Sequence, residues 1–247
     1  MESPASPLNS DAILSPEHDP LGQAALAYWR EKTEVDIQVH SDVGIEDVLP
    51  VKWLFRSHEQ MPDWEQQALT HCQGKVLDIG AGVGSHSLYL QEQGHEVCAL
   101  DISPGAVAVM QDRGVKRTLL QDLWAFPPEP FDTLLLMMNG IGFVGNLLGL
   151  NRFLQQAKQW LAPGGQILLD SSDVRYFYEQ DGEYFLPEDQ YYGIIQYRMH
   201  WKDCYGPCFD WLYIEPQRLQ KHAKMFGYQY NLLATGPHFE YLAQLSL

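Results

Sequence analysis

Short apolar runs alternate with amphipathic stretches through the middle of this 247-residue chain. The apolar runs predict strands at residues 76–79, 96–100, 118–120, 133–138 and 166–169. Apolar residues at helical spacing predict helices over 86–93, 103–113 and 148–161. The run 133–138 is unbroken, which is typical of a strand that is covered on both faces of a sheet. This alternation predicts an α/β fold with a mainly parallel sheet.

The beginning of the chain shows a different pattern. Residues 1–20 contain four prolines and predict a flexible tail. Residues 21–73 predict a cap across the entrance to the sheet, with helices at 21–32 and 62–72 and a short strand or extended crossing at 35–39.

The last third of the chain predicts further strands. Two of them, at 191–201 and 209–214, are predicted to form a hairpin that turns around residues 204–208. A closing helix at 215–226 and strands at 228–234 and 239–245 follow. We therefore predict a single domain over residues 21–247, made of a cap at 21–73, a cofactor-binding core at 74–175, an inserted hairpin segment at 176–214 and a closing segment at 215–247.

Charge and cysteine content narrow the possible partners. The formal net charge of −16 repels phosphate backbones, so we expect no nucleic-acid partner. No stretch is long and apolar enough to span a bilayer, and the first residues do not have the pattern of a secretion signal, so we expect no membrane partner. The four cysteines are too sparse for a disulfide framework, which predicts reduced thiols and a cytoplasmic location. The sequence leaves the oligomeric state open.

One stretch, residues 75–85, carries the clearest functional signal. After its predicted strand, Gly80, Gly82 and Gly84 occupy alternate positions. Glycine has no Cβ, so a ligand can lie against bare backbone at such a loop. Strand, loop and the following helix N-terminus predict a cofactor cradle at the carboxyl end of a parallel strand.

Three acids near strand ends indicate which ligand the cradle binds. Asp101 ends the second strand, where its carboxylate can accept hydrogen bonds from ribose hydroxyls. Asp122 ends the third strand, where it can accept a hydrogen bond from an adenine amine. Asp78 lies two residues before the loop, where it would oppose a pyrophosphate and suits a cationic ligand. The Gly-x-Gly-x-Gly spacing also differs from the dinucleotide fingerprint, so the pattern favours a cationic nucleoside.

These motifs resemble, in order, those of class I S-adenosylmethionine-dependent methyltransferases, over about residues 60–173. The similar segments are the glycine loop at 76–84, the second-strand acid Asp101, the adenine-contacting motif at 121–123, the fourth-strand motif at 131–136 and the turn into the fifth strand at 161–169. The resemblance implies a Rossmann-like three-layer sandwich with a seven-stranded, mostly parallel sheet whose last strand is reversed. It also implies S-adenosyl-L-methionine as the cofactor. The residues that it assigns to the cofactor are Asp78, Gly80, Ala81, Gly82, Gly84, Asp101, Ile102, Gln121, Asp122, Leu123 and Asn139.

The candidates for catalysis are Asn139, His86 and Asp170, near the expected position of the methyl group. An oxygen or protonated nitrogen nucleophile must lose a proton during methyl transfer. Each candidate has a structural alternative. His86 can be a capping or surface group, Asn139 can bond loose backbone at a strand end, and Asp170 can be a solvated turn acid.

The candidates for binding the methyl acceptor are Arg56, Phe143 and Asp173, with Tyr28 reaching from the cap. Arg56 can instead pair with a surface carboxylate, Phe143 can belong to the core, and Asp173 can be a solvated turn acid. A separate group, His200, Cys204 and Cys208, has the spacing of metal ligands, but the intervening residues favour a hairpin turn, and we predict no metal.

The end of the fourth predicted strand lacks the sequence motifs of methyltransferases that act on nucleic acids. The fourth strand ends in Asn139-Gly-Ile-Gly rather than in Asn/Asp-Pro-Pro-Tyr, and it has no Pro-Cys. We therefore predict an enzyme that transfers a methyl group from S-adenosylmethionine to an unidentified small molecule by in-line displacement. An NAD(P)-dependent oxidoreductase on a similar sheet and a non-catalytic cofactor-binding or regulatory protein are the alternatives.

Overall fold

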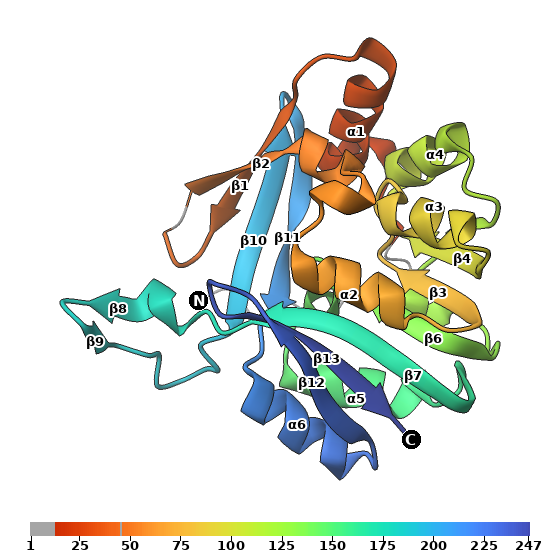
Figure 1. Cartoon of the computed structure of the whole chain (residues 1–247). Coiled ribbons are helices and arrows are strands. Elements are labelled where there is room, and N and C mark those ends of the chain that lie inside the picture. Colours follow the sequence, from red (N-terminus) through yellow and green to blue (C-terminus); the bar gives the residue numbers. More distant parts are fainter. Residues whose placement is uncertain (1–12, 45) are drawn as a thin grey trace.

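The computed structural model describes residues 13–44 and 46–247, and its centre is a seven-stranded sheet (Figure 1). In spatial order the strands are β12 (Gln229–Thr235), β13 (Glu240–Ser246), β7 (Leu161–Ser172), β6 (Phe131–Leu136), β3 (Lys75–Ile79), β4 (Glu96–Asp101) and β5 (Thr118–Leu120). Strand β13 is antiparallel to both of its neighbours, whereas β7, β6, β3, β4 and β5 are mutually parallel. The predicted sheet with a reversed last strand is confirmed.

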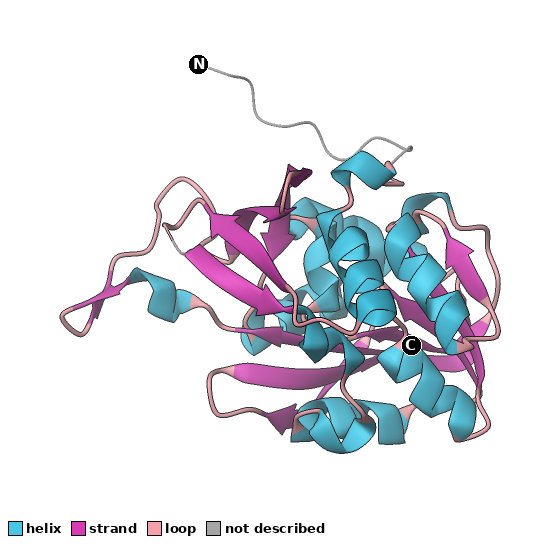
Figure 2. Ribbon diagram, turned by 90° about the horizontal axis from the view of Figure 1, so that it is seen from above, coloured by secondary structure: helices cyan, strands magenta, loops and turns pink. Residues whose placement is uncertain are grey.

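Helices cover both faces of this sheet (Figure 2). They are α1 (Pro20–Glu31), α2 (Asp63–His71), α3 (Ser85–Glu92), α4 (Pro104–Arg113), α5 (Leu147–Ala157) and α6 (Pro216–Met225). Successive side chains of a strand point to opposite faces. Leu134 and Leu136 therefore join the core cluster of α5 and α6, while Leu135 joins that of α2 and α3. The apolar part of β6, residues 134–136, thus has the two-sided burial that its pattern predicts.

A second sheet joins the two segments that flank the site in sequence. Its order is β11 (Cys204–Leu212), β10 (Ile194–Trp201), β1 (Asp36–Ser41) and β2 (Glu46–Pro50), all antiparallel. The N-terminal cap and the inserted hairpin thus form one structure beside the carboxyl ends of the central strands. A single sequence does not show which strands pair across 150 residues, so this union was not predicted.

The hairpin turns earlier than predicted. Its turn is at Lys202 and Asp203, and Lys202 adopts a left-handed φ of 51°. Cys204 and Cys208 both lie inside β11, where their Cα partners are Trp201 and Arg198. Gly206 and Pro207 suggested a turn, but a register shift in the ladder accommodates them within the strand.

The predicted tail is also wrong in part. Residues 1–12 lie outside the described chain, but residues 13–19 pack against the body and include a short 3-10 helix, η1 (Pro16–His18). Asp19 is fully buried and caps α1, whose first residue is Pro20. Two of the four prolines therefore begin helices, which is a favourable place for a residue without an N–H group.

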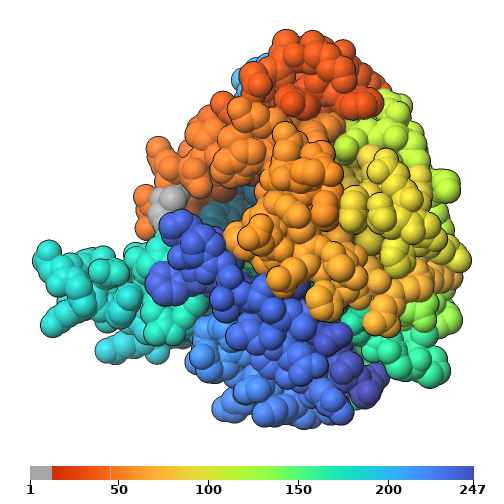
Figure 3. All heavy atoms as spheres, viewed as in Figure 1, coloured from red at the N-terminus to blue at the C-terminus, as the bar shows by residue number. Residues whose placement is uncertain are grey.

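The remaining elements are short. The 3-10 helices are η2 (Val51–Phe55), η3 (His58–Gln60), η4 (Leu123–Ala125), η5 (Gly140–Val144) and η6 (Arg175–Tyr178). Strands β8 (Glu179–Gln180) and β9 (Glu183–Tyr184) form a small ribbon that projects from the body (Figures 1 and 3). Over the described residues, no helix has the length and apolar character needed to cross a membrane.

Candidate active site

The loop after β3 leaves its backbone uncovered at two glycines. Gly80 and Gly82 have left-handed φ angles of 70° and 56°, and a Cβ built on either would meet nothing within 4 Å. Gly84 is also left-handed, but a Cβ there would lie 2.8 Å from Val115 and 2.9 Å from Met110. The first two positions therefore leave room for a ligand, and the third lets the loop pack closely on its neighbours.

Asp101 joins this loop to the start of α4. Its Oδ2 accepts a hydrogen bond from the Gly82 N–H at 2.8 Å, and its Oδ1 accepts one from the Ser103 N–H at 2.9 Å. Burial is the main reason why the pKa of Asp101 is raised to about 6, although these two N–H groups oppose the effect. Each carboxylate oxygen keeps a lone pair that can accept from a ribose hydroxyl.

Asp122 has a buried oxygen without a partner among the described residues. Its Oδ1 accepts a hydrogen bond from the Trp124 N–H at 3.0 Å, whereas Oδ2 has none. An unpaired buried acceptor costs about 1–3 kcal/mol, so a donor is expected there. The exocyclic amine of adenine is such a donor. The neighbouring Gln121 N–H donates to the Asp101 carbonyl at 3.0 Å, which ties the two strand ends together.

Two further residues assigned to the cofactor have different surroundings. Leu123 is almost completely buried in the core. Ile102 is half-buried, and its carbonyl accepts a hydrogen bond from the Leu14 N–H at 3.0 Å. The N-terminal segment therefore contacts the strand end that carries Asp101.

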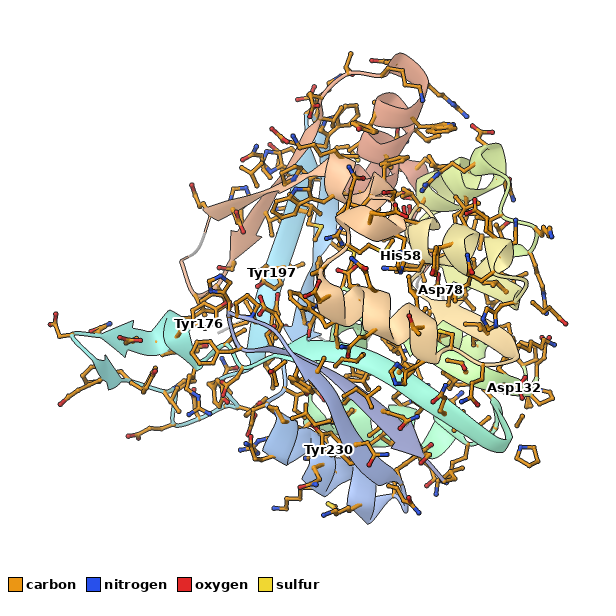
Figure 4. The ribbon with its side chains drawn as sticks, in the orientation of Figure 1. His58, Asp78, Asp132, Tyr176, Tyr197 and Tyr230 are labelled. Carbon is orange, nitrogen blue, oxygen red and sulfur yellow. The ribbon has the colours of Figure 1, made fainter. Side chains whose placement is uncertain are left out.

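Asp78 is covered by protein beside the glycine loop (Figure 4). Its Oδ2 accepts a hydrogen bond from the Ser87 hydroxyl of α3 at 2.6 Å. Burial raises the pKa of Asp78, while the charge of His86 opposes the rise. Asp78 thus supports α3 through Ser87 and has almost no exposed surface of its own.

Glu65, which sequence analysis missed, connects two of the predicted residues. Its carboxylate accepts two hydrogen bonds from one guanidinium nitrogen of Arg56, at 2.9 and 3.1 Å, and its Oε2 lies 3.0 Å from Nε2 of His86. A signal for Glu65 was present, because it lies on the same helix face as the buried Ala68 and Leu69. An acid on a buried helix face needs a cationic partner.

His86 is buried among three acids. Burial alone would lower its pKa, but the hydrogen bond that its Nε2–H donates to Glu65 and the charges of Asp78, Glu65 and Asp170 together raise it. The pKa of His86 therefore lies above its ordinary value.

Asp170 and Asn139 meet at the ends of β7 and β6. Oδ1 of Asp170 accepts a hydrogen bond from the Asn139 N–H at 2.8 Å. Burial first, and then the charge of Glu65, raise the pKa of Asp170 to about 7. The Asn139 side chain donates to the Leu212 carbonyl at 3.1 Å and accepts from the Ser171 hydroxyl at 2.6 Å. Its left-handed φ of 55° places all these groups within reach.

The other candidates are engaged elsewhere. Phe143 packs edge-on against Phe153, with ring centroids 5.8 Å apart. Asp173 pairs with Arg175 and accepts a hydrogen bond from the Tyr192 hydroxyl at 2.9 Å.

Tyr28 and His200 lie in separate environments. Tyr28 lines a separate cavity of about 320 Å³ together with Trp29, Phe55 and Arg113. His200 stacks on His40, with Nδ1 and Nε2 3.1 Å apart. Over residues 13–44 and 46–247, no group of three or more His, Cys, Asp or Glu residues is placed to hold a metal.

The residues at this edge fit an adenosine-bearing cation. Gly80 and Gly82 leave their backbone open to a ligand, Asp101 lies beside them with lone pairs to spare, and Asp122 has an unpaired buried acceptor oxygen. Asp78 lies buried beside the loop, where its carboxyl group accepts a hydrogen bond from the Ser87 hydroxyl.

Known proteins with similar sequences and structures include methyltransferases that use S-adenosylmethionine. The profile of the methyltransferase domain family matches residues 53–229. An S-adenosylmethionine-dependent methyltransferase from Bacteroides fragilis, crystallised with S-adenosyl-L-homocysteine, is 43% identical and has a TM-score of 0.89 over 95% of this chain and 97% of that one.

Two curated relatives match over shorter segments. Demethylmenaquinone methyltransferase of Tropheryma whipplei is 28% identical over 100 residues, which is 38% of this chain and 40% of that protein. The probable non-canonical nonribosomal peptide synthetase CymA of Salinispora arenicola is 30% identical over 131 residues, which is 48% of this chain and 2% of that protein. The match thus spans only part of these two relatives. The family profile and the Bacteroides fragilis structure confirm the family and cofactor predicted from the sequence: the chain belongs to the class I S-adenosylmethionine-dependent methyltransferases.

Proposed function

We propose that this chain transfers the methyl group of S-adenosylmethionine to a small organic acceptor. The observation that carries the cofactor assignment is the pairing of an uncovered glycine loop with the unpaired buried oxygen of Asp122. The bound cofactor supplies an activated methyl group on a sulfonium. The protein must then align the acceptor and exclude water.

A hollow beside the site supports a small acceptor. Figure 3 shows it between β1–β2, α2 and the loop from β12 to β13. Strand β10, which carries Tyr197, lies at its base (Figures 3 and 4). The hydroxyl of Tyr197 lies 3.2 Å from the hydroxyl of Tyr213. A hollow bordered by the cap and by this loop suits a molecule of limited size rather than a polymer, and the net charge of −16 disfavours a nucleic acid.

Asp170 is our candidate for the group that accepts the acceptor's proton. It lies near the carboxyl end of β7, the edge of a parallel sheet where ligands bind, and accepts a hydrogen bond from the Asn139 N–H. A carboxylate whose pKa is about 7 can hold a proton near neutral pH and release it again. As the acceptor bonds to the methyl carbon, the carbon–sulfur bond breaks with its electron pair on sulfur, and the proton moves to Asp170.

The other predicted residues support this geometry. Asn139 positions Asp170 through its N–H and ties β6 to β7 and β11 through its amide. His86 and Arg56 hold Glu65, whose charge raises the pKa of Asp170. Asp173 is paired with Arg175 and Phe143 packs on Phe153, so we assign neither of them to binding of the acceptor. We also propose a cytoplasmic location, which the four unpaired thiols support.

The test is to incubate the protein and S-adenosylmethionine with pools of small amines, phenols and carboxylic acids, and to measure the S-adenosylhomocysteine that forms. Asp170→Asn is expected to keep cofactor affinity within about threefold and to lower turnover by about a hundredfold or more. Cofactor binding without turnover in any pool would favour the non-catalytic alternative. Tighter binding of NADH than of S-adenosylhomocysteine would favour the oxidoreductase.

A further inference from the structure

The segment before α1 is bonded to the strand end that carries Asp101. Asp19 is fully buried, and its carboxylate accepts three hydrogen bonds at the N-termini of two helices. The donors are the Gly22 N–H of α1 at 2.9 Å, the Ser103 hydroxyl at 2.7 Å and the Gly105 N–H of α4 at 3.0 Å. One side chain therefore fixes α1 to α4.

Ser103 lies between two carboxylates. Its N–H donates to Asp101 at 2.9 Å, and its hydroxyl donates to Asp19 at 2.7 Å. The same hydroxyl oxygen accepts the Ala106 N–H at 2.9 Å and so caps α4. Since the other oxygen of Asp101 holds the Gly82 N–H, hydrogen bonds run without a break from Asp19 to the glycine loop.

Close packing makes this connection stiff. A Cβ on Gly105 would lie 2.4 Å from the carbonyl carbon of Gly22, so α1 and α4 meet at backbone distance. The Leu14 N–H donates to the Ile102 carbonyl at 3.0 Å on the same strand end. The N-terminal segment cannot shift without moving the turn that orients Asp101.

We propose that Asp19 is a positioning residue of the cofactor site, which acts through Ser103 to hold Asp101 and Gly82 in the arrangement that binds adenosine. The proposal rests on the cofactor use proposed above. It gives residues 13–19 a role in binding.

Charge provides a readout that a merely structural role would lack. Burial is the largest cause of the raised pKa of Asp101, and the charge of Asp19 raises it further. The groups that oppose this rise are the N–H groups of Ser103, Gly82 and Ile102. Removal of the Asp19 charge therefore lowers the pH at which Asp101 is half-ionised.

The experiment is calorimetric titration of the full chain with S-adenosylhomocysteine between pH 5 and 8. Wild-type affinity is expected to weaken below about pH 6, because ribose hydroxyls donate to the ionised carboxylate. Asp19→Asn is expected to bind about tenfold more weakly at pH 7.5, with its midpoint shifted to lower pH. Ser103→Ala keeps the Asp19 charge and the N–H bond to Asp101, so its affinity falls about threefold to tenfold with an unchanged midpoint.

Asp112→Asn is the charge-matched control. Asp112 lies on α4 in an exposed pair with Arg30 at 3.6 Å, about 12 Å along the helix from Pro104, and its removal should change neither affinity nor midpoint. If Asp19→Asn lowers only the melting temperature and leaves affinity and midpoint unchanged, the proposal is wrong. If that variant does not fold, unchanged affinity in Ser103→Ala overturns the proposal. Absence of binding by the wild type would instead overturn the cofactor assignment itself.

Discussion

Glu65 of α2 and His86 of α3 are joined by a buried contact, with Oε2 and Nε2 3.0 Å apart. Both side chains are less than one-tenth exposed, and Arg56 completes the group from the cap. This contact attaches the cap to the helix that follows the glycine loop. The cap is thus part of the site's structure as well as its cover.

Glu65→Gln removes the buried charge and leaves Arg56 and His86 without their common partner. The expected loss in the free energy of unfolding is about 3 kcal/mol, because breaking a buried ion pair leaves an uncompensated charge. Glu129→Gln is a matched control, since Glu129 also pairs with two cations, Lys75 and Arg117, in a more exposed place. It should cost about 1 kcal/mol. Urea unfolding at pH 7.5 compares the two, and equal losses would show that Glu65 has no special role.

Asp170→Asn tests the raised pKa of about 7. An exposed Asp in the unfolded chain has a pKa of about 3.9. Between these two values the folded state holds a proton that the unfolded state has lost, so the wild-type free energy of unfolding falls as pH rises. The asparagine variant resembles the neutral acid and lacks this loss. Its stability relative to the wild type should therefore rise by a few kcal/mol, roughly, between pH 4 and 7. Urea unfolding at both pH values measures this, and a pH-independent difference would contradict the assignment.

Gly82→Ala tests the uncovered backbone of the loop. Alanine at a left-handed φ costs about 1 kcal/mol, and the added methyl group would occupy the ligand's place. Gly94→Ala is the control, because Gly94 is also left-handed with nothing within 4 Å of its Cβ position, but it stands at the far end of α3. Both variants should lose similar stability by calorimetry. Only Gly82→Ala should bind S-adenosylhomocysteine more than tenfold more weakly, and equal affinities would refute a role for the loop.

Asp122→Asn tests the unpaired oxygen. The asparagine carbonyl can still accept from the Trp124 N–H, while its NH₂ replaces the free acceptor. The new NH₂ group and the exocyclic amine of adenine are both donors and would face each other. Affinity for S-adenosylhomocysteine should therefore fall by about tenfold to a hundredfold. The analogue with a 6-oxo purine should lose far less, because its oxygen accepts from the new NH₂. If affinity for both ligands falls by the same factor, adenine does not bind at Asp122.

The central sheet could be predicted from the sequence because its strands are short apolar runs and its turns carry local signals. Gly80 and Gly82 need φ values that favour glycine, and Ser103-Pro104 begins α4 as its residue types predict. These features depend on neighbours in the chain. Local chemistry was therefore enough to predict the fold and the cofactor.

The rest depends on contacts between distant segments. The pairing of β1 with β10 and the bond from Asp19 to Ser103 each join residues far apart in the chain. The prolines of the first twenty residues indicated disorder, and only the buried partners of Asp19 show why the segment is ordered. Asn139 was correctly placed at a strand end, but its amide is used by Leu212 and Ser171, which no local pattern reveals.

The most direct test of the account is calorimetric titration of S-adenosylhomocysteine into wild-type protein and Asp101→Ala at pH 7.5. Asp101 is the carboxylate that we assign to the ribose, and it also holds the Gly82 N–H. The wild type should bind, and the folded variant should bind at least about a hundredfold more weakly, because two charge-assisted hydrogen bonds and the loop anchor are lost. Equal affinity in the two proteins, or no binding by the wild type, would contradict the account.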